Sequence, residues 1–289
     1  MRLVQYILKN DPQGMRHLGV RVGEEIVNMQ SIRKGVPNTL LEMLTTHKNF
    51  LDEVETMPMD QFKERVTINQ VNLLPPISGS DKVVCVGMNY VDHCEEQNCP
   101  VPEEPIFFSK FSTTLVGPFD PIPYPKMTKE LDFEVELAFV IGKKGKDIPI
   151  SSAMDYVLGY TTAHDVSARD WQLKKNGGQW LIGKTMDAFS PIGPHIVTKS
   201  EIPDPHNLAI KCHVNGVTEQ NSNTGQIIHR VDKLVSFLSQ FCTLLPGDII
   251  LTGTPPGVGV FRKPPLFLKK GDVVECEIEK IGLIRNEIV

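Results

Sequence analysis

The sequence predicts an α+β protein that is rich in β-structure. Most of its apolar runs are short and are separated by turns that draw on 22 glycines and 22 prolines, whereas patterns with a helical period are brief. A doubly wound parallel sheet would need longer helices in regular alternation with strands, and no repeat of fixed period is present. With 289 residues and 40% hydrophobic content, the chain is long enough to bury a large core.

Residues 1–75 are expected to form a small N-terminal region. Residues 1–30 alternate apolar and polar positions in the manner of a hairpin. Asn38 is then predicted to cap a helix that carries the leucines from Leu40 to Leu51, and Pro58 closes this stretch. The larger unit is expected to span residues 76–289.

In the larger unit, short strands outnumber helices. Two helical segments are predicted, at residues 168–175 and 231–241. The predicted strands are residues 83–86, 131–141, 156–163, 208–214, 248–252 and 273–278.

Acidic side chains occupy alternate positions in the predicted strand at 131–141. Asp132, Glu134 and Glu136 are separated by apolar residues, so the two glutamates share one face of the strand. Asp165 follows the next predicted strand. Three carboxylates that converge would make an all-oxygen site of the kind that magnesium or manganese prefers, because neighbouring carboxylates repel unless a cation lies between them. From these residues alone, a solvated strand face is the alternative.

Three further residues are candidates for proton transfer. Lys184 follows an apolar run, where burial would disfavour its charged form and allow proton exchange near neutral pH; the alternative is a surface lysine. His93 and Glu96 are three residues apart, so on a helical turn the carboxylate can orient the imidazole as a general base. The alternative for this pair is a short solvated segment.

Arg169 and Gln172 have the same spacing and are candidates for binding a substrate carboxylate, which the planar guanidinium of arginine suits. An ion pair between Arg169 and Asp170 or another acid is the alternative. The Gly-rich loop at residues 252–259 offers backbone N–H groups and the Thr254 hydroxyl to an anion, although such a loop by itself is more often a plain turn.

Other classes of function are disfavoured. The net charge of −5, without a run of Lys or Arg longer than a pair, argues against nucleic acid and membrane surfaces. Gly178–Thr185 spells a phosphate-loop string, but its bulky interior residues argue against nucleotide binding, and residues 252–259 do not fit a dinucleotide pattern. Cys94 and Cys99 beside His93 lack a fourth ligand for zinc, and the six cysteines are predicted to be reduced.

From about residue 81 onward, the sequence resembles the fumarylacetoacetate hydrolase family. The resemblance is carried by KVVCVGMNYVDH, PIFFSKF, DFEVELAFVIG, TAHDVSARDWQ, GKTMDAFSPIGP and LTGTPPGVG. GMNYVDHCEEQNCPVP and FRKPPLFLKKGD are most similar to the subgroup to which oxaloacetate tautomerase activity is assigned. The resemblance implies a mixed β-sheet roll with a small N-terminal α/β cap region.

The resemblance also implies roles for individual residues. It makes Glu134, Glu136 and Asp165 ligands of magnesium, with manganese or calcium as alternatives. It makes Lys184 the active-site lysine. It assigns His93 and Glu96 to catalysis on a lid, and Arg169 and Gln172 to contacts with a substrate carboxylate. Asn89, Tyr90 and Lys110 are further candidates for the pocket lining.

The implied activity is tautomerisation of oxaloacetate, a small 2-oxo acid, between its enol and keto forms. Hydrolysis of a C–C bond in an acylpyruvate or fumarylacetoacetate-like diketone and decarboxylation of oxaloacetate are the alternatives, and a non-catalytic metal-binding scaffold is disfavoured. The resemblance further implies a homodimer in the mitochondrion. Because the chain begins MRLVQYILKN, without the character of a presequence, a cytoplasmic location is the alternative.

Overall fold

A computed structural model describes residues 1–47 and 49–289. Its architecture is β-rich and mixed, as the sequence predicts, and its helices are short. The helices are α1 (Met29–Ile32), α2 (Leu40–Thr46), α3 (Phe50–Thr56), α4 (Val91–Glu96), α5 (Leu181–Lys184) and α6 (Val231–Phe241). Among the described residues, no helix is both long and apolar enough to cross a membrane.

One large sheet of twelve strands forms the frame of the molecule. Its strands follow the order β4 (Arg65–Thr67), β3 (Glu25–Asn28), β2 (His17–Val22), β1 (Arg2–Leu8), β13 (Ser190–Thr198), β11 (Val157–His164), β10 (Val135–Ile141), β16 (Ile249–Leu251), β6 (Val83–Gly87) and β7 (Ile106–Lys110), with β5 (Val71–Leu73) on β1 and β8 (Leu115–Val116) on β13. Most neighbours are antiparallel, whereas β16 with β6 and β13 with β8 are parallel.

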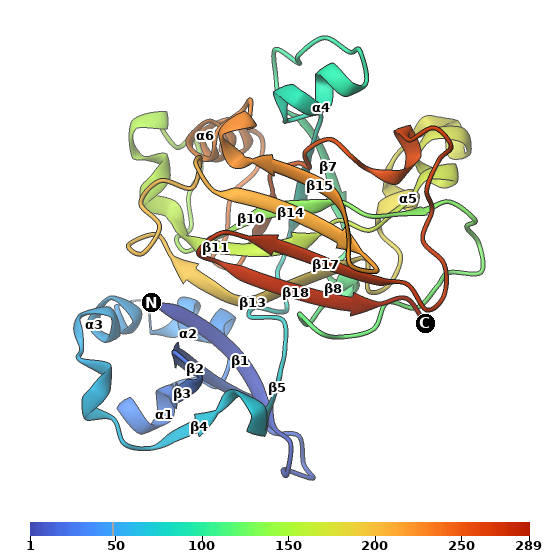
Figure 1. Ribbon diagram of the computed structural model, residues 1–289. Coiled ribbons are helices and arrows are strands. Elements are labelled where there is room, and N and C mark those ends of the chain that lie inside the picture. Colours follow the sequence, from blue (N-terminus) through green and yellow to red (C-terminus); the bar gives the residue numbers. More distant parts are fainter. Residues whose placement is uncertain (48) are drawn as a thin grey trace.

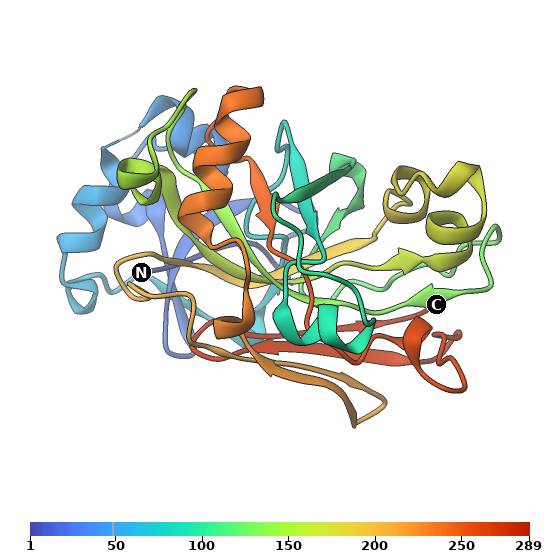
Figure 2. The ribbon, with the colours of Figure 1, turned by 90° about the horizontal axis from the view of Figure 1, so that it is seen from above.

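A second sheet covers one face of the large sheet. Its order is β15 (Val217–Asn223), β14 (Ala209–Val214), β17 (Val273–Ile278) and β18 (Gly282–Glu287), and a two-stranded ribbon joins β9 (Leu131–Asp132) to β12 (Ser167–Ala168). The orange and red strands of the second sheet cross the front of Figure 1. Seen from above in Figure 2, they form a separate layer beside the green strands.

The central strand β10 is buried along its whole length because both of its faces are covered. Leu137 and Phe139 belong to the core between the two sheets, which also contains Ile210 of β14. Ala138 and Val140, which point the other way, pack in the cluster that includes the leucines of α2 and α3. A strand buried on both faces is typically a nearly continuous run of apolar residues. Because a buried charge is costly unless it has a partner, Glu134 and Glu136 require charged or polar groups around them.

The N-terminal region folds into strands β1 to β5 and helices α1 to α3, the blue elements of Figure 1. Its strand β1 pairs with β13 at Arg2↔Val197 and Leu3↔Ile196, so it extends the large sheet of the rest of the chain. The division near residue 75 therefore stays a prediction. Residues 1–30 contain three strands, more than the predicted hairpin.

Three predicted elements differ from the structure. The single helix predicted through Leu51 is two helices, and the first is capped by Thr39, whose hydroxyl accepts from the Glu42 N–H, while Asn38 accepts from Gln30. The strand predicted at 131–141 breaks between β9 and β10 because its two parts pair with different strands, β12 and β11. The helix predicted at 168–175 is a π-helical turn at Asp170–Lys174.

The core between the sheets predicts how much stability is lost when a large side chain of β10 is removed. Phe139 is fully buried, so Phe139→Ala should lower the free energy of unfolding by about 3–5 kcal/mol in urea denaturation. Phe119→Ala is the matched control, because that ring is 55% exposed and its loss should cost about 0.5 kcal/mol or less. Equal losses for the two variants would contradict this description of the core.

Candidate metal and active site

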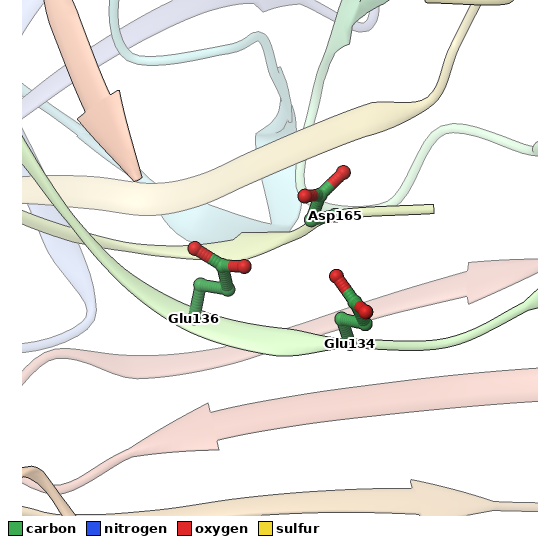
Figure 3. Close-up of side chains that lie close together, drawn as sticks. All are labelled: Glu134, Glu136 and Asp165. Carbon is green, nitrogen blue, oxygen red and sulfur yellow. The ribbon is translucent and has the colours of Figure 1, made fainter. Parts of the chain in front are cut away.

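The three predicted carboxylates converge. Glu134 directly precedes β10, Glu136 is its second residue, and Asp165 directly follows β11. Each offers one ligand oxygen, and these oxygens all lie within 4.8 Å of one another. Antiparallel pairing produces this arrangement, because Val135 is opposite His164 and the Asp165 N–H donates to the Glu134 carbonyl at 2.9 Å. Figure 3 shows the three carboxylates turned toward a common space.

Three buried cations surround the carboxylates. Lys184 Nζ donates to Glu134 at 2.7 Å and to Asp165 at 2.9 Å. Lys110 pairs with the other oxygen of Asp165 and donates to the Val166 carbonyl at 3.1 Å. Lys110, a candidate for the pocket lining in the sequence, therefore holds a carboxylate of the triad in place.

Arg169 is also committed to acidic partners. Its guanidinium donates to Asp132 at 2.8 Å, to Glu134 at 2.5 Å and to the Gln172 side-chain oxygen at 2.9 Å. Asp170, the partner considered from the sequence, instead pairs with Lys175 at 2.9 Å. The contact of Arg169 and Gln172 with a substrate stays a prediction, and both residues line the pocket described below.

The surroundings shift the pKa values of the two glutamates in opposite directions. Burial would raise the pKa of Glu134, but Arg169 and Lys184 outweigh burial and lower it. Burial raises the pKa of Glu136 well above its usual value, and the charges of Asp165 and Glu134 raise it further. Among the described residues Glu136 forms no ion pair; its polar contact is the Gly253 N–H at 2.7 Å. Glu136 is thus the carboxylate that still lacks a cation.

The composition of the cluster fits a hard divalent cation. Carboxylate oxygens are the ligands that magnesium, manganese and calcium prefer, and three of them meet here in a buried place beside a pocket. The cluster contains one more acid than base; its acids are Asp132, Glu134, Glu136 and Asp165, and its bases are Lys110, Arg169 and Lys184. In the described parts of the chain, no other group of His, Cys, Asp and Glu forms a comparable cluster.

Lys184 differs from its prediction in one respect. Burial alone would lower the pKa of this lysine, which was the expectation from the apolar run before it. Asp165 and Glu134 outweigh burial and raise the pKa above its ordinary value. The expectation of a lowered pKa for Lys184 is therefore wrong in this arrangement, because two carboxylates contact its Nζ.

A small pocket of about 70 Å³ opens beside the carboxylates. Its wall includes Glu134, Glu136 and Lys184, and several of its other lining residues are apolar. The remaining lining residues are Val86, Gly87, Met88, His93, Gln97, Phe108, Arg169, Gln172, Leu173, Trp180, Thr254 and Phe261. The volume suits a ligand of few atoms.

Helix α4 brings the predicted dyad to this pocket. His93 Nδ1 lies 2.9 Å from Glu96 Oε2, which is the contact that the three-residue spacing predicts. The other oxygen of Glu96 accepts from the Gly257 N–H at 2.9 Å. Gly257 has φ +103°, and a Cβ there would lie 2.2 Å from the Glu219 carbonyl oxygen, so only glycine fits this loop.

The remaining predicted residues have structural partners. The Thr254 hydroxyl donates to the Val135 carbonyl and accepts from Gln220, at 2.8 Å each, although Thr254 also lines the pocket. Asn89 bonds the backbone of His229 and Thr252, and neither Asn89 nor Tyr90 is among the pocket-lining residues of the described chain. No role was predicted for Asp132 or Gln97, although both carry a signal in the sequence. Asp132 alternates with Glu134, and Gln97 is four residues after His93.

The mixed β-fold brings a buried carboxylate triad, a lysine and a histidine dyad to one small pocket. The fold and the site thus define a protein with a carboxylate-rich pocket whose ligand oxygens fit a metal ion. The sequence model described as "Fumarylacetoacetate (FAA) hydrolase C-terminal" matches residues 82–289. The chain belongs to the fumarylacetoacetate hydrolase family.

Relatives within this family match over nearly the whole chain. The mitochondrial oxaloacetate tautomerase fahd2 of Xenopus laevis is 52% identical over 289 residues, covering 100% of this chain and 90% of the relative. The mitochondrial oxaloacetate tautomerase FAHD2A of Homo sapiens is 52% identical over 275 residues, covering 94% and 87%.

Solved structures show the same fold. A putative HpcE protein from Mycobacterium smegmatis superposes with a TM-score of 0.87 at 33% identity, covering 100% of this chain and 99% of that one. Maleylpyruvate hydrolase from Sphingobium sp. SYK-6, in complex with manganese(II) and pyruvate, superposes with a TM-score of 0.80 at 28% identity, with the same coverage.

The cluster predicts which substitution abolishes cation binding. Glu136→Gln keeps the shape of the side chain but removes the carboxylate that lacks an ion pair, so Mn²⁺ affinity should fall by about 100-fold or more in titrations followed by electron paramagnetic resonance. Glu277→Gln on the exposed face of β17 is the matched control and should bind like the unmodified protein. Equal affinity in both variants would show that the cation binds elsewhere.

Proposed function

We propose that this protein is a magnesium-dependent enzyme that interconverts the enol and keto forms of oxaloacetate. The observation that carries the proposal is the convergence of Glu134, Glu136 and Asp165. Two of these carboxylates, Glu134 and Glu136, line a pocket together with Lys184. The names of relatives that are 52% identical support the substrate. Magnesium is preferred here, with manganese and calcium as alternatives that the same oxygen ligands accept.

Glu134, Glu136 and Asp165 would hold the magnesium ion. Bound there, it would supply Lewis-acid chemistry that polarises the 2-oxo group of a substrate and so eases the loss of a proton from C3. Arg169 and Gln172 border the same pocket and would orient the substrate. Because Arg169 already pairs with Asp132 and Glu134, it contributes a fixed positive charge that does not need to be reorganised during the reaction.

Lys184 is the first candidate to move the proton. An ammonium ion has three donors, and two of them bond Glu134 and Asp165, which leaves one for a ligand in the pocket. Tautomerisation requires that a proton leave one atom of the substrate and another reach a second atom, so a protonated lysine can supply one half of the exchange. The His93 and Glu96 pair is the alternative for this role.

A second candidate function is hydrolysis of a C–C bond in an acylpyruvate-like diketone. The observation that favours it is the formed contact between His93 and Glu96 at the pocket, the geometry of a general base. The structural neighbour named maleylpyruvate hydrolase supports the same chemistry. Decarboxylation of oxaloacetate is a third candidate because it passes through the same enolate.

We further propose a mitochondrial location, which rests on the names of the relatives, with the cytoplasm as the alternative. A homodimer is proposed from the family resemblance. A scaffold without catalysis is disfavoured, because such a protein would have no need to keep three buried carboxylates, a buried lysine and the histidine pair together.

The leading function predicts a specific optical assay. With magnesium, the purified protein should accelerate the loss of enol-oxaloacetate absorbance without producing a matching amount of pyruvate, and chelation of the metal should abolish the acceleration. Stoichiometric pyruvate in the same tube would instead identify a decarboxylase. Absence of any acceleration would reject the tautomerase and favour diketone hydrolysis.

The role of Lys184 predicts a second result. Lys184→Met should lower kcat for tautomerisation by about 100-fold or more, because it removes the ammonium donor that lines the pocket and contacts Glu134 and Asp165. Lys233→Met on α6, where the side chain is 41% exposed, is the control and should keep the unmodified rate. Near-normal turnover by Lys184→Met, combined with loss in His93→Ala, would transfer the role to the histidine pair.

A further inference from the structure

Helix α4 is fastened over the pocket at both of its ends. Near its start, the Ser222 hydroxyl of β15 donates to Asp92 at 2.5 Å. At its end, Glu96 accepts from the Gly257 N–H at 2.9 Å. His93 lies between these two attachments, 6% exposed, and lines the pocket. The position of the imidazole is therefore fixed without any ligand.

Both nitrogens of this imidazole already have partners. Nδ1 lies 2.9 Å from a carboxylate oxygen of Glu96, and Nε2 lies 2.8 Å from the amide nitrogen of Gln97. An ionised carboxylate can only accept, so Nδ1 carries the hydrogen, and the lone pair of a neutral ring is then at Nε2. The Gln97 amide donates to that lone pair. A neutral imidazole has no second acceptor, so nothing remains to accept a proton from water.

Gln97 is placed for this contact by the helix. It follows α4 directly and is four residues from His93, so the two side chains share a face. Its amide nitrogen also lies 3.3 Å from Met88 Sδ, which fixes the amide from a second direction. Gln97 itself lines the pocket, so its amide occupies the place beside Nε2 where an attacking water would otherwise sit.

We propose that Gln97 is a specificity-determining residue that prevents the His93 pair from activating water. This inference rests on the proposed function, since it concerns the same pocket and the same class of 2-oxo acids. With Gln97 in place, the site can move protons on a substrate but does not hydrolyse it. With Gln97 shortened, a water takes the position of the amide, and the pair becomes a general base.

The reaction gained would be hydrolysis of a 2,4-diketo acid. His93 Nε2 takes one proton from water, and the oxygen of that water forms a bond to the C4 carbonyl carbon. The C3–C4 bond then breaks, its electron pair remains on C3 as the enolate of pyruvate, and C3 accepts the proton that His93 holds. One diketo acid and one water give one carboxylic acid and one pyruvate, without an oxidant or other co-reactant.

The test uses acetylpyruvate, magnesium and the full chain. Gln97→Ala should produce acetate and pyruvate at least about tenfold faster than the unmodified protein, and Gln240→Ala on the exposed face of α6 should show no gain. The double variant His93→Ala/Gln97→Ala should lose the gain, a result that a merely structural role for Gln97 would not produce. No gain in a Gln97→Ala protein that still binds Mn²⁺, or equally fast hydrolysis by the unmodified protein, would overturn the proposal.

A measurement on the unmodified protein covers the case in which Gln97→Ala fails to fold. Long-range ¹⁵N–¹H spectra of the histidine rings, with His93 assigned by comparison with His93→Gln, should show a neutral ring protonated at Nδ1. A ring protonated at Nε2 would overturn the inference. Neither experiment depends on tautomerase activity, so failure of the oxaloacetate assay and failure of this inference give separate results.

Discussion

The antiparallel register of β10 and β11 is the constraint on which the rest of the site depends. Because Val135 pairs with His164, the residues flanking that pair, Glu134 and Asp165, are brought together, and Glu136 lies one step further along β10. A slip of one residue would turn both glutamates toward the other face, into the core between the sheets. The apolar layers on both sides of β10 fix this register. The packing of the hydrophobic core therefore also determines where the glutamates lie.

Charge balance explains how so many carboxylates are tolerated at this depth. Buried ions lose their hydration, and pairing recovers this cost only when every charge has a partner. Most of these acids form ion pairs with Lys110, Lys184 or Arg169. Glu136 instead accepts a hydrogen bond from a backbone N–H. A divalent cation would complete the cluster and leave an excess of positive charge, which suits a small anionic substrate. The same balance of buried charges would therefore determine both the stability of the site and its affinity for ligands.

The sequence predicted the parts of the fold in which local pattern dominates. Strand β17 and helix α6 agree with their predicted bounds, because alternation and helical spacing are clear there. The break between β9 and β10 was not predictable, since it arises from a change of pairing partner far along the chain. Strand positions alone did not establish the triad, because they are equally compatible with a solvated strand face; the resemblance to the family indicated it. The raised pKa of Lys184 depends on contacts with Asp165 and Glu134 that only the folded structure creates.

We propose that three carboxylates from two neighbouring strands form a divalent cation site. Anomalous diffraction from crystals grown with Mn²⁺ and a 2-oxo dicarboxylate tests this proposal most directly. We expect a manganese peak bounded by Glu134, Glu136 and Asp165, with the organic anion in contact with the ion and beside Lys184. A peak elsewhere, or no peak at a Mn²⁺ concentration that saturates binding in solution, would contradict it.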